Sequence, residues 1–258
     1  MRNGILANSR MSLISALSFA HQSELCAKTA SEEATRFTSR ADQMFAVTTG
    51  VSCTAAMPEG PARTALLEPL NAKLKALLAA PEGLMADDVS SGYELLVDQR
   101  DEAKDEAGKL AVGKAWQAFL DDAAVKAKTP AARASFDAHR VLAAMAAGEP
   151  EHMIGPLQQS EKEFPKDYNP PARLAALYRS QGKLDDALKA LDRALGKCEG
   201  PRKLRLYSAQ AGVFELKGDV AGRKKSLQAG LAYAKTLPAV QRPTKLVATL
   251  EETLKTLH

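Results

Sequence analysis

The chain has few aromatic residues, few cysteines and no long apolar run. Only 5% of its 258 residues are aromatic, and a single residue is tryptophan. No stretch approaches the roughly 20 apolar residues that a helix needs to cross a membrane, so no membrane span is predicted. Runs of β-branched residues are nearly absent, and Ala and Leu supply much of the 45% apolar content. Because Ala and Leu favour helices, the composition predicts an all-helical protein.

The three cysteines, Cys26, Cys53 and Cys198, form neither a Cys-X-X-Cys pair nor a metal-binding spacing. Their odd number argues against a complete disulfide framework but leaves room for one bond. We expect each to be a buried or tolerated thiol. His139 and His152 fall on neighbouring predicted helices without a clustered carboxylate or thiol, so we expect surface or turn roles for them. No metal site is predicted.

Motifs that carry catalysis are also missing. The stretch from Gly108 to Lys114 spells most of a phosphate-binding P-loop, but Ala115 stands where Ser or Thr must bind magnesium, and no strand precedes it. There is no Gly-X-Ser-X-Gly and no Gly-X-Gly-X-X-Gly motif. The acidic runs 161–163 and 185–186 are expected on solvated helix faces, because catalytic carboxylates need a pocket. We therefore expect no catalytic residue, no cofactor and no enzymatic activity.

The net charge of +4 is unevenly distributed. Residues 201–258 carry 11 Lys or Arg against 4 Asp or Glu, a local excess of seven, so the rest of the chain is at −3. Such a basic third is compatible with an acidic partner. Few aromatic residues are interleaved for base stacking, so a solvated helix face is expected in preference to a nucleic-acid surface.

The clearest pattern, at 165–195, predicts two amphipathic helices joined by a turn at Gly182. Asn169 is expected to cap the first helix, with Pro170 at its first position. One face of this helix carries Leu174, Leu177, Tyr178 and Gln181. The second helix is expected to start at Leu184, followed by two aspartates that suit the helix dipole. Its expected buried face consists of Ala187, Leu188, Leu191, Ala194 and Leu195.

The turn glycine recurs at Gly148 and Gly218, 34 and 36 residues from Gly182. This pattern resembles the tetratricopeptide repeat (TPR) family. That family places a leucine, a small residue and a tyrosine on the first helix, then a turn glycine, then alanines around a bulky apolar residue; the matching residues are Leu174, Ala175, Tyr178, Gly182, Ala187, Leu191 and Ala194. The resemblance implies an all-α fold of stacked antiparallel helical hairpins, a TPR-like right-handed solenoid with a C-terminal capping helix.

The resemblance also suggests boundaries. TPR-like repeats are expected at 129–237 and divergent helical hairpins at 31–128. Residues 238–258 are expected to form the capping helix, whose apolar stripe is Leu246, Leu250 and Leu254. Residues 1–30 are expected to form an amphipathic first helix or a frayed, partly disordered terminus, with a weak signal peptide as the further alternative. A cytoplasmic location is favoured, and a periplasmic or secreted one follows if residues 1–20 act as a signal.

Several helices can be placed individually. Residues 45–53 have strand-like composition but are predicted helical, because no second strand exists to pair with them. Pro69 predicts a kink, or a helix that starts near Glu68. Further helices are expected at about 88–104 and 106–126. The next hairpin is expected to run from Thr129 to about Ala147, turn at Gly148, and end near Phe164.

In TPR proteins the first helices line a concave groove that binds peptides. By resemblance, the groove-facing residues here are Ser135, Asn169, Arg179, Arg205, Ser208 and Glu215. Some members clamp a C-terminal carboxylate with Lys, Asn and Arg; the corresponding positions here hold Ala138 and Leu142, Ala172 and Ala176, Ser208 and Gly212. The clamp is absent. We expect a non-catalytic module that binds a peptide or protein partner; the oligomeric state is not predicted.

A narrower resemblance covers about 100–258. The runs 164–174, 200–204 and 237–243 are similar to repeat regions that follow thioredoxin-like domains in some bacterial proteins. The chain lacks the Cys-X-X-Cys motif and any βαβ segment, so thiol chemistry is not implied. The resemblance supplies an alternative function, an accessory or regulatory subunit of a bacterial thioredoxin-like thiol-disulfide system.

Overall fold

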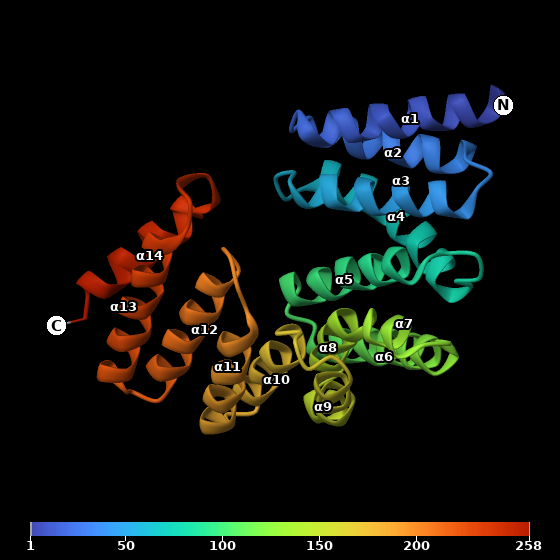
Figure 1. Ribbon diagram of the computed structural model, residues 1–258. Helices are drawn as coiled ribbons and strands as arrows, with labels where there is room; N and C mark the ends of the chain where they lie inside the picture. The colour runs from blue at the N-terminus through green and yellow to red at the C-terminus, as the bar shows by residue number, and fades with distance from the viewer. Residues whose placement is uncertain (1, 258) are drawn as a thin grey trace. The chain divides into compact units, whose positions relative to one another are not determined.

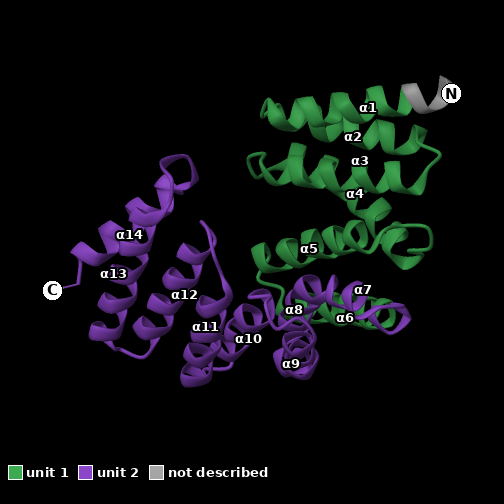
Figure 2. Ribbon diagram, viewed as in Figure 1, with its two compact units in different colours: residues 1–123 green, residues 124–258 purple. Residues whose placement is uncertain are grey.

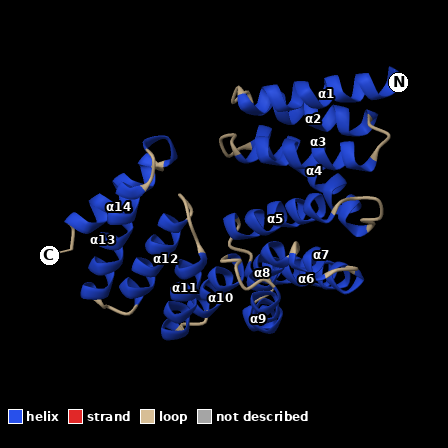
Figure 3. Ribbon diagram, viewed as in Figure 1, coloured by secondary structure: helices blue, strands red, loops and turns tan. Residues whose placement is uncertain are grey.

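The computed structural model describes residues 2–257, and all of their regular structure is helical (Figures 1 and 3). Consecutive helices pack against one another, as expected for an all-α helical solenoid. The chain divides into two compact units, residues 1–123 and 124–258 (Figure 2). Each unit has its own apolar core.

Unit 1 is a two-layer stack of helices. Its elements are α1 (Arg2–Phe19), α2 (Ser23–Arg36), α3 (Arg40–Ala55), α4 (Pro61–Ala79), α5 (Ala86–Glu102) and most of α6 (Glu106–Lys126). In Figure 1, α1, α3 and α5 form the front layer, with α3 packed against both neighbours, and α2 and α4 lie behind them. Of the alternatives for residues 1–30, the first helix is present as α1, and Ile14 is buried in the core.

Small residues bring α2 and α3 together. Ala27 and Ala30 of α2 and Ala46 of α3 are fully buried. A methyl group added at Gly50 would lie 2.9 Å from the Cβ of Ala30 and 2.9 Å from a methyl group of Leu70, so the close approach requires glycine. The strand-like stretch 45–53 is helical, as predicted, and its buried residues Ala46, Val47, Gly50, Val51 and Cys53 follow the spacing of a helix that packs against α2 and α4.

A disulfide joins the same two helices. Cys26 and Cys53 are bonded, with their Cα atoms 6.1 Å apart. The expectation of three thiols is therefore wrong for this pair and holds for Cys198 alone, which is a buried free cysteine. No local motif indicates the bond, because the two residues are 27 positions apart and meet only through the packing of α2 on α3.

The predicted helices at 88–104 and 106–126 are confirmed as α5 and α6. Trp116 of α6 is buried; its Nε1 donates a hydrogen bond to Ser90 Oγ at 3.1 Å, and its ring stacks on Tyr93 at 6.3 Å. The expected helix start near Glu68 is wrong, because α4 begins at Pro61. Pro69 lies inside α4 on its exposed side, where water can bind the carbonyl that a proline leaves unpaired.

Unit 2 contains three hairpins and a final helix. Its elements are α7 (Pro130–Ala134), α8 (Asp137–Ala146), the 3₁₀ helix η1 (Pro150–Met153), α9 (Ile154–Glu163), α10 (Asn169–Ser180), α11 (Leu184–Lys197), α12 (Lys203–Leu216), α13 (Val220–Thr236), the 3₁₀ helix η2 (Ala239–Gln241) and α14 (Thr244–Lys255). The three predicted turn glycines, Gly148, Gly182 and Gly218, have φ of 72°, 71° and 69°. This left-handed conformation favours glycine and confirms the turns.

The hairpin α10–α11 matches its prediction closely. The buried face of α11 holds Ala187, Leu191, Ala194 and Leu195 as expected, with Ala190 buried and Leu188 half-buried. Asn169 does not cap α10. Instead Asp167 Oδ1 accepts from the Asn169 backbone N–H at 2.9 Å and from its Nδ2 at 2.7 Å. The carboxylate two residues earlier therefore does what the sequence assigned to Asn169.

The first hairpin of unit 2 is more broken than predicted. The single helix expected from Thr129 to Ala147 is interrupted, because the chain leaves α7 at Ser135 and re-enters a helix at Asp137. Ser135 Oγ donates to the Ala132 carbonyl at 2.7 Å, a local bond that competes with helix continuation. The second helix is likewise preceded by η1, which starts at Pro150.

The final helix α14 covers the last hairpin, as a terminal helix must in stacked repeats. Leu250 is buried against Ala211 and Leu227, and Leu246 and Leu254 pack beside it. The predicted stripe on α14 is thus confirmed as its contact with α12 and α13.

A substitution tests the α10–α11 contact. Ala187 is fully buried, so Ala187→Leu should overpack the hairpin and lower the free energy of unfolding by about 1–3 kcal/mol. Urea denaturation followed by circular dichroism measures the change. Lys189→Leu, an exposed position on the same helix, is the control; an unchanged midpoint for Ala187→Leu would show that Ala187 does not face its partner helix.

Reduction tests the disulfide. Closing a loop of 27 residues should stabilise the chain by about 3.5 kcal/mol in the chain-entropy description. We expect reducing agent, or Cys26→Ser with Cys53→Ser, to lower the denaturation midpoint, and Cys198→Ser to leave its response to reductant unchanged. Mass spectrometry without reductant should detect one bond and one thiol; three free thiols would contradict the bond.

Candidate functional site

The six predicted groove residues all lie in unit 2, but the structure does not gather all of them. Ser208 and Glu215 are seven residues apart and share one face of α12, with Arg205 beside them. Arg179 is exposed near the end of α10. Ser135 and Asn169 lie at helix ends, and both side chains are engaged locally, with the Ala132 carbonyl and with Asp167.

Equivalent positions on the first helices of the three hairpins form a repeating surface. Counting 34 and then 36 residues along the chain gives three sets, which we name the first-helix face: Ala138, Leu142 and Met145 on α8; Ala172, Ala176 and Arg179 on α10; Ser208, Gly212 and Glu215 on α12. All nine residues are half-buried or exposed. Most of them therefore lie outside the contacts that build the hairpins, while Ala172 packs against the core and Glu215 pairs with Arg223.

Small and apolar side chains dominate this face. Leu142 and Met145 are exposed at 46% and 40%. At Gly212 an added methyl group would meet no atom within 4 Å, so the position opens onto free space. Small residues let a partner backbone approach closely, and exposed Leu and Met offer it apolar contact.

Two arginines supply charge beside these small residues. Arg179 and Arg205 are exposed, and neither forms an ion pair with another described residue. Glu215 differs, because Arg223 of α13 pairs with it at 2.8 Å. The side of the face near α12 can therefore offer guanidinium groups to a carboxylate, while Glu215 is already engaged within its own hairpin.

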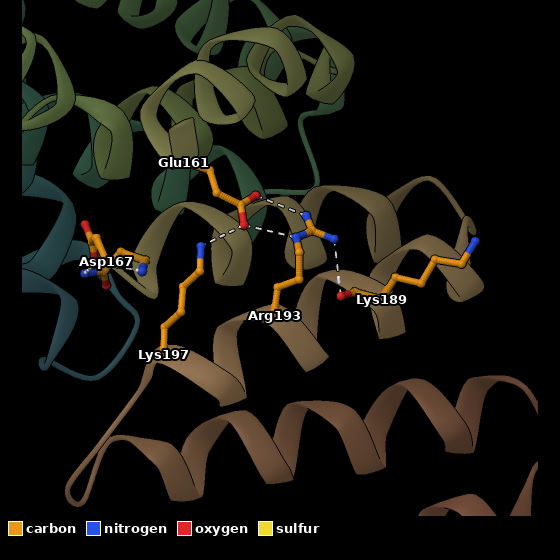
Figure 4. A network of polar contacts seen from close by, with 6 residues as sticks. Glu161, Asp167, Lys189, Arg193 and Lys197 are labelled. Atoms are coloured by element: carbon orange, nitrogen blue, oxygen red, sulfur yellow. Dashed lines mark hydrogen bonds and ion pairs between the residues drawn. The ribbon is translucent and has the colours of Figure 1, made fainter. Parts of the chain in front are cut away.

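Glu161 is the centre of a polar network in unit 2 (Figure 4). Its carboxylate accepts from Arg193 at 3.0 and 3.1 Å and from Lys197 at 2.9 Å, and Arg193 also donates to the Lys189 carbonyl. The sequence placed Glu161 on a solvated helix face, which is wrong, because only 16% of its side chain is exposed. Burial alone would raise the pKa of Glu161, but the hydrogen bonds from Arg193 and Lys197 lower it below its ordinary value.

The network joins successive hairpins. Glu161 lies on α9 and its partners lie on α11, 32 and 36 residues later. Asp185 of α11 pairs with Lys217, at the end of α12, again across 32 residues. Because Glu161 and Asp185 are each paired with basic residues about one repeat away, these contacts tie successive hairpins together.

A buried serine–aspartate pair lies between α8 and α9. Ser160 Oγ donates to Asp137 Oδ2 at 2.6 Å, and both side chains are almost inaccessible to solvent. Burial raises the pKa of Asp137, while the Ser160 hydrogen bond and the charges of Arg140, Arg173 and Arg133 oppose that rise. A pair sealed from substrate ties α8 to α9 instead of performing chemistry.

No group of three or more His, Cys, Asp or Glu is arranged to hold a metal ion within residues 2–257. No helix described in the structure combines the length and the apolar character needed to span a membrane.

The sequence analysis did not predict a hollowed surface in unit 1. Two depressions of about 420 and 680 Å³ lie along α1, α3 and α5. Along α3 their lining follows one helical stripe, Phe45, Thr48, Thr49 and Ser52. That spacing was available in the sequence, but hydroxyl-bearing residues in a helix carry no signal until the neighbouring helices are in place.

The Glu161 network gives a prediction that depends on pH. The folded pKa of Glu161 is depressed, so its contribution is present above the ordinary value of 4.5 and is lost as the pH falls below it. Glu161→Gln should cost about 1 kcal/mol at pH 7, a modest value because Arg193 is 45% exposed, and the cost should shrink in acid. Urea unfolding at pH 7 and at a pH below the ordinary pKa of Glu161 measures this cost, and exposed Glu151→Gln is the matched control. A cost that does not change with pH would contradict the ionised network.

The described helices form an all-α helical stack, and the first-helix face is its repeating accessible surface in unit 2. No protein-family model matches this sequence, and the comparison with curated proteins gave no match.

Proposed function

We propose that the protein is a non-catalytic interaction module, built of TPR-like repeats, which binds a peptide or protein segment along the first-helix face. The observation that supports this most is the repetition of small or apolar, solvent-accessible residues through three hairpins. Exposed Leu142 is in register with Ala176 and Gly212, and exposed Met145 lies one turn further along the same face of α8. Covering this apolar area would stabilise a complex by about 25 cal/mol per Å² before the costs of association.

The chemistry of the face specifies a kind of segment. Alanine and glycine positions accept a backbone or a bulky apolar side chain, and Leu142 and Met145 add apolar contact. Arg179 and Arg205 favour carboxylates, since guanidinium–carboxylate hydrogen bonds are among the stronger polar contacts. The Lys and Asn residues of a carboxylate clamp are missing, so we propose an internal apolar and acidic segment as the ligand, not a chain terminus.

The states of the three cysteines give little support to the alternative function, a subunit of a thiol-disulfide system. Cys26 and Cys53 are buried and bonded to each other. Burial raises the pKa of the Cys198 thiol, and the thiolate is the form that reacts.

Because disulfides persist in oxidising compartments, we propose the periplasmic or secreted location in preference to the cytoplasmic one.

Selection of peptides tests the proposal. A phage-displayed library of random peptides is panned on the whole chain, and the enriched sequence is synthesised. We expect it to combine apolar and acidic residues. Arg179→Glu with Arg205→Glu should weaken its binding at least about tenfold, which corresponds to about 1.4 kcal/mol.

The matched control is Lys224→Glu with Lys225→Glu, which makes the same change in net charge at exposed positions of α13. We expect this variant to bind within about twofold of the parent, because a distant exposed charge is screened by salt. A library that yields no enriched sequence, or equal losses in both double variants, would argue against the first-helix face as the binding surface.

A further inference from the structure

The front layer of unit 1 carries two adjoining depressions of different chemistry. One is lined by Ser18 of α1, by Thr48, Thr49 and Ser52 of α3, and by Ser91, Glu94, Leu95 and Asp98 of α5. The other is lined by Asn8, Met11, Ser12, Ser15, Ala16 and Phe19 of α1 and by Phe45 of α3. They meet where Ser18 precedes Phe19 and where Phe45 lies one turn before Thr48.

Hydroxyl groups in the first depression are oriented as acceptors. Thr48 Oγ1 donates to the Met44 carbonyl at 2.8 Å, Ser52 Oγ to the Thr48 carbonyl at 3.0 Å, and Ser91 Oγ to the Asp87 carbonyl at 3.0 Å. A hydroxyl has one proton and two lone pairs. Because these protons are already used within their own helices, the three oxygens have only lone pairs left for a ligand.

The charged residues of the lining also favour a positively charged ligand. Glu94 and Asp98 add carboxylates to the lining, and no Lys or Arg belongs to it. Asp98 is exposed and forms no ion pair within the described part of the chain. Hydroxyl lone pairs together with carboxylates complement a group that carries positive charge and several N–H donors, as an ammonium or guanidinium group does.

The second depression adds an apolar surface at a fixed spacing. Phe19 is 84% exposed, and the half-buried Met11 and Phe45 lie along the same depression. One turn of α3 separates Phe45 from Thr48, a rise of about 5 Å. Side chains two residues apart on one side of an extended peptide are separated by about 7 Å. A single extended segment can therefore place an apolar side chain on Phe19 and Phe45 and a cationic one among the hydroxyls.

We propose that the α1–α3–α5 layer of unit 1 binds a basic peptide segment in which Lys or Arg lies two residues from an apolar side chain. The positive group enters the depression of Thr48, Ser52, Ser91 and Asp98, and the apolar side chain covers Phe19. This site takes a ligand of opposite charge to that of the first-helix face of unit 2. It does not rest on the function proposed for that face.

A short peptide tests the proposal directly. The probe is Ac-Gly-Phe-Gly-Lys-Gly-NH2, titrated into the whole chain while the methyl signals of Thr48, Thr49 and Leu95 are followed by NMR. We expect these signals to shift with a single dissociation constant. Norleucine in place of the lysine should weaken binding at least about tenfold, because the apolar stem remains and the charge is lost.

Two protein variants localise the interaction. Asp98→Lys should weaken the lysine peptide at least about tenfold. Glu68→Lys makes the same change in charge on the exposed side of α4, in the other layer, and should leave binding within about twofold because surface charges are screened. Both variants change exposed residues, so circular dichroism should show the parent fold.

Several results would overturn the proposal. The site does not select a cation if the lysine and norleucine peptides bind equally, or if the lysine peptide leaves the three methyl signals unmoved at millimolar concentration. Equal losses in Asp98→Lys and Glu68→Lys would reduce the effect to overall charge. Spermidine that shifts the same signals as tightly as the peptide would show a polyamine site in place of a peptide site.

Discussion

Close approach of paired helices is the constraint on which the whole structure depends. At the contact between α2 and α3 there is no room for a side chain at Gly50, and in α13 a methyl group at Gly222 or Gly230 would press on Phe214 or Tyr207. The alanines of α11 serve the same purpose against α10. Since apolar burial is shared among many small side chains, the stack needs few aromatic residues, which explains how 5% suffices.

Polar contacts join one hairpin to the next. Glu161 binds two basic residues about one repeat later, and Asp185 binds one, Lys217, at the following step. In unit 1 a disulfide fixes α2 to α3, and a buried Trp116–Ser90 hydrogen bond links α6 to α5. Repeat proteins are stabilised by nearest-neighbour terms, so each such link acts locally and the register of the stack is set step by step.

The sequence predicted what local rules control. Turn glycines at positive φ, the buried stripe of α11 and the covering stripe of α14 follow from periodicity, because each depends on one or two helices. The Cys26–Cys53 bond, the Asp167 contact to Asn169 and the Glu161 network depend on which residues packing brings together. The hollowed surface of unit 1 escaped prediction for the same reason, since Thr48 and Ser52 resemble any half-exposed helical residues until α1 and α5 lie beside them.

The division between packed and unpacked positions allows the two proposed binding surfaces to differ along one chain. Residues such as Ala187 and Gly50 cannot change without disturbing a helix pair, whereas Leu142, Arg179, Thr48 and Asp98 contribute little to any core. The first-helix face combines small apolar positions with arginines, and the front layer of unit 1 combines hydroxyl lone pairs with carboxylates. The two proposed surfaces of opposite electrostatic preference are therefore compatible with one hairpin architecture, because most of the residues proposed to contact a ligand are not those that hold the helices together.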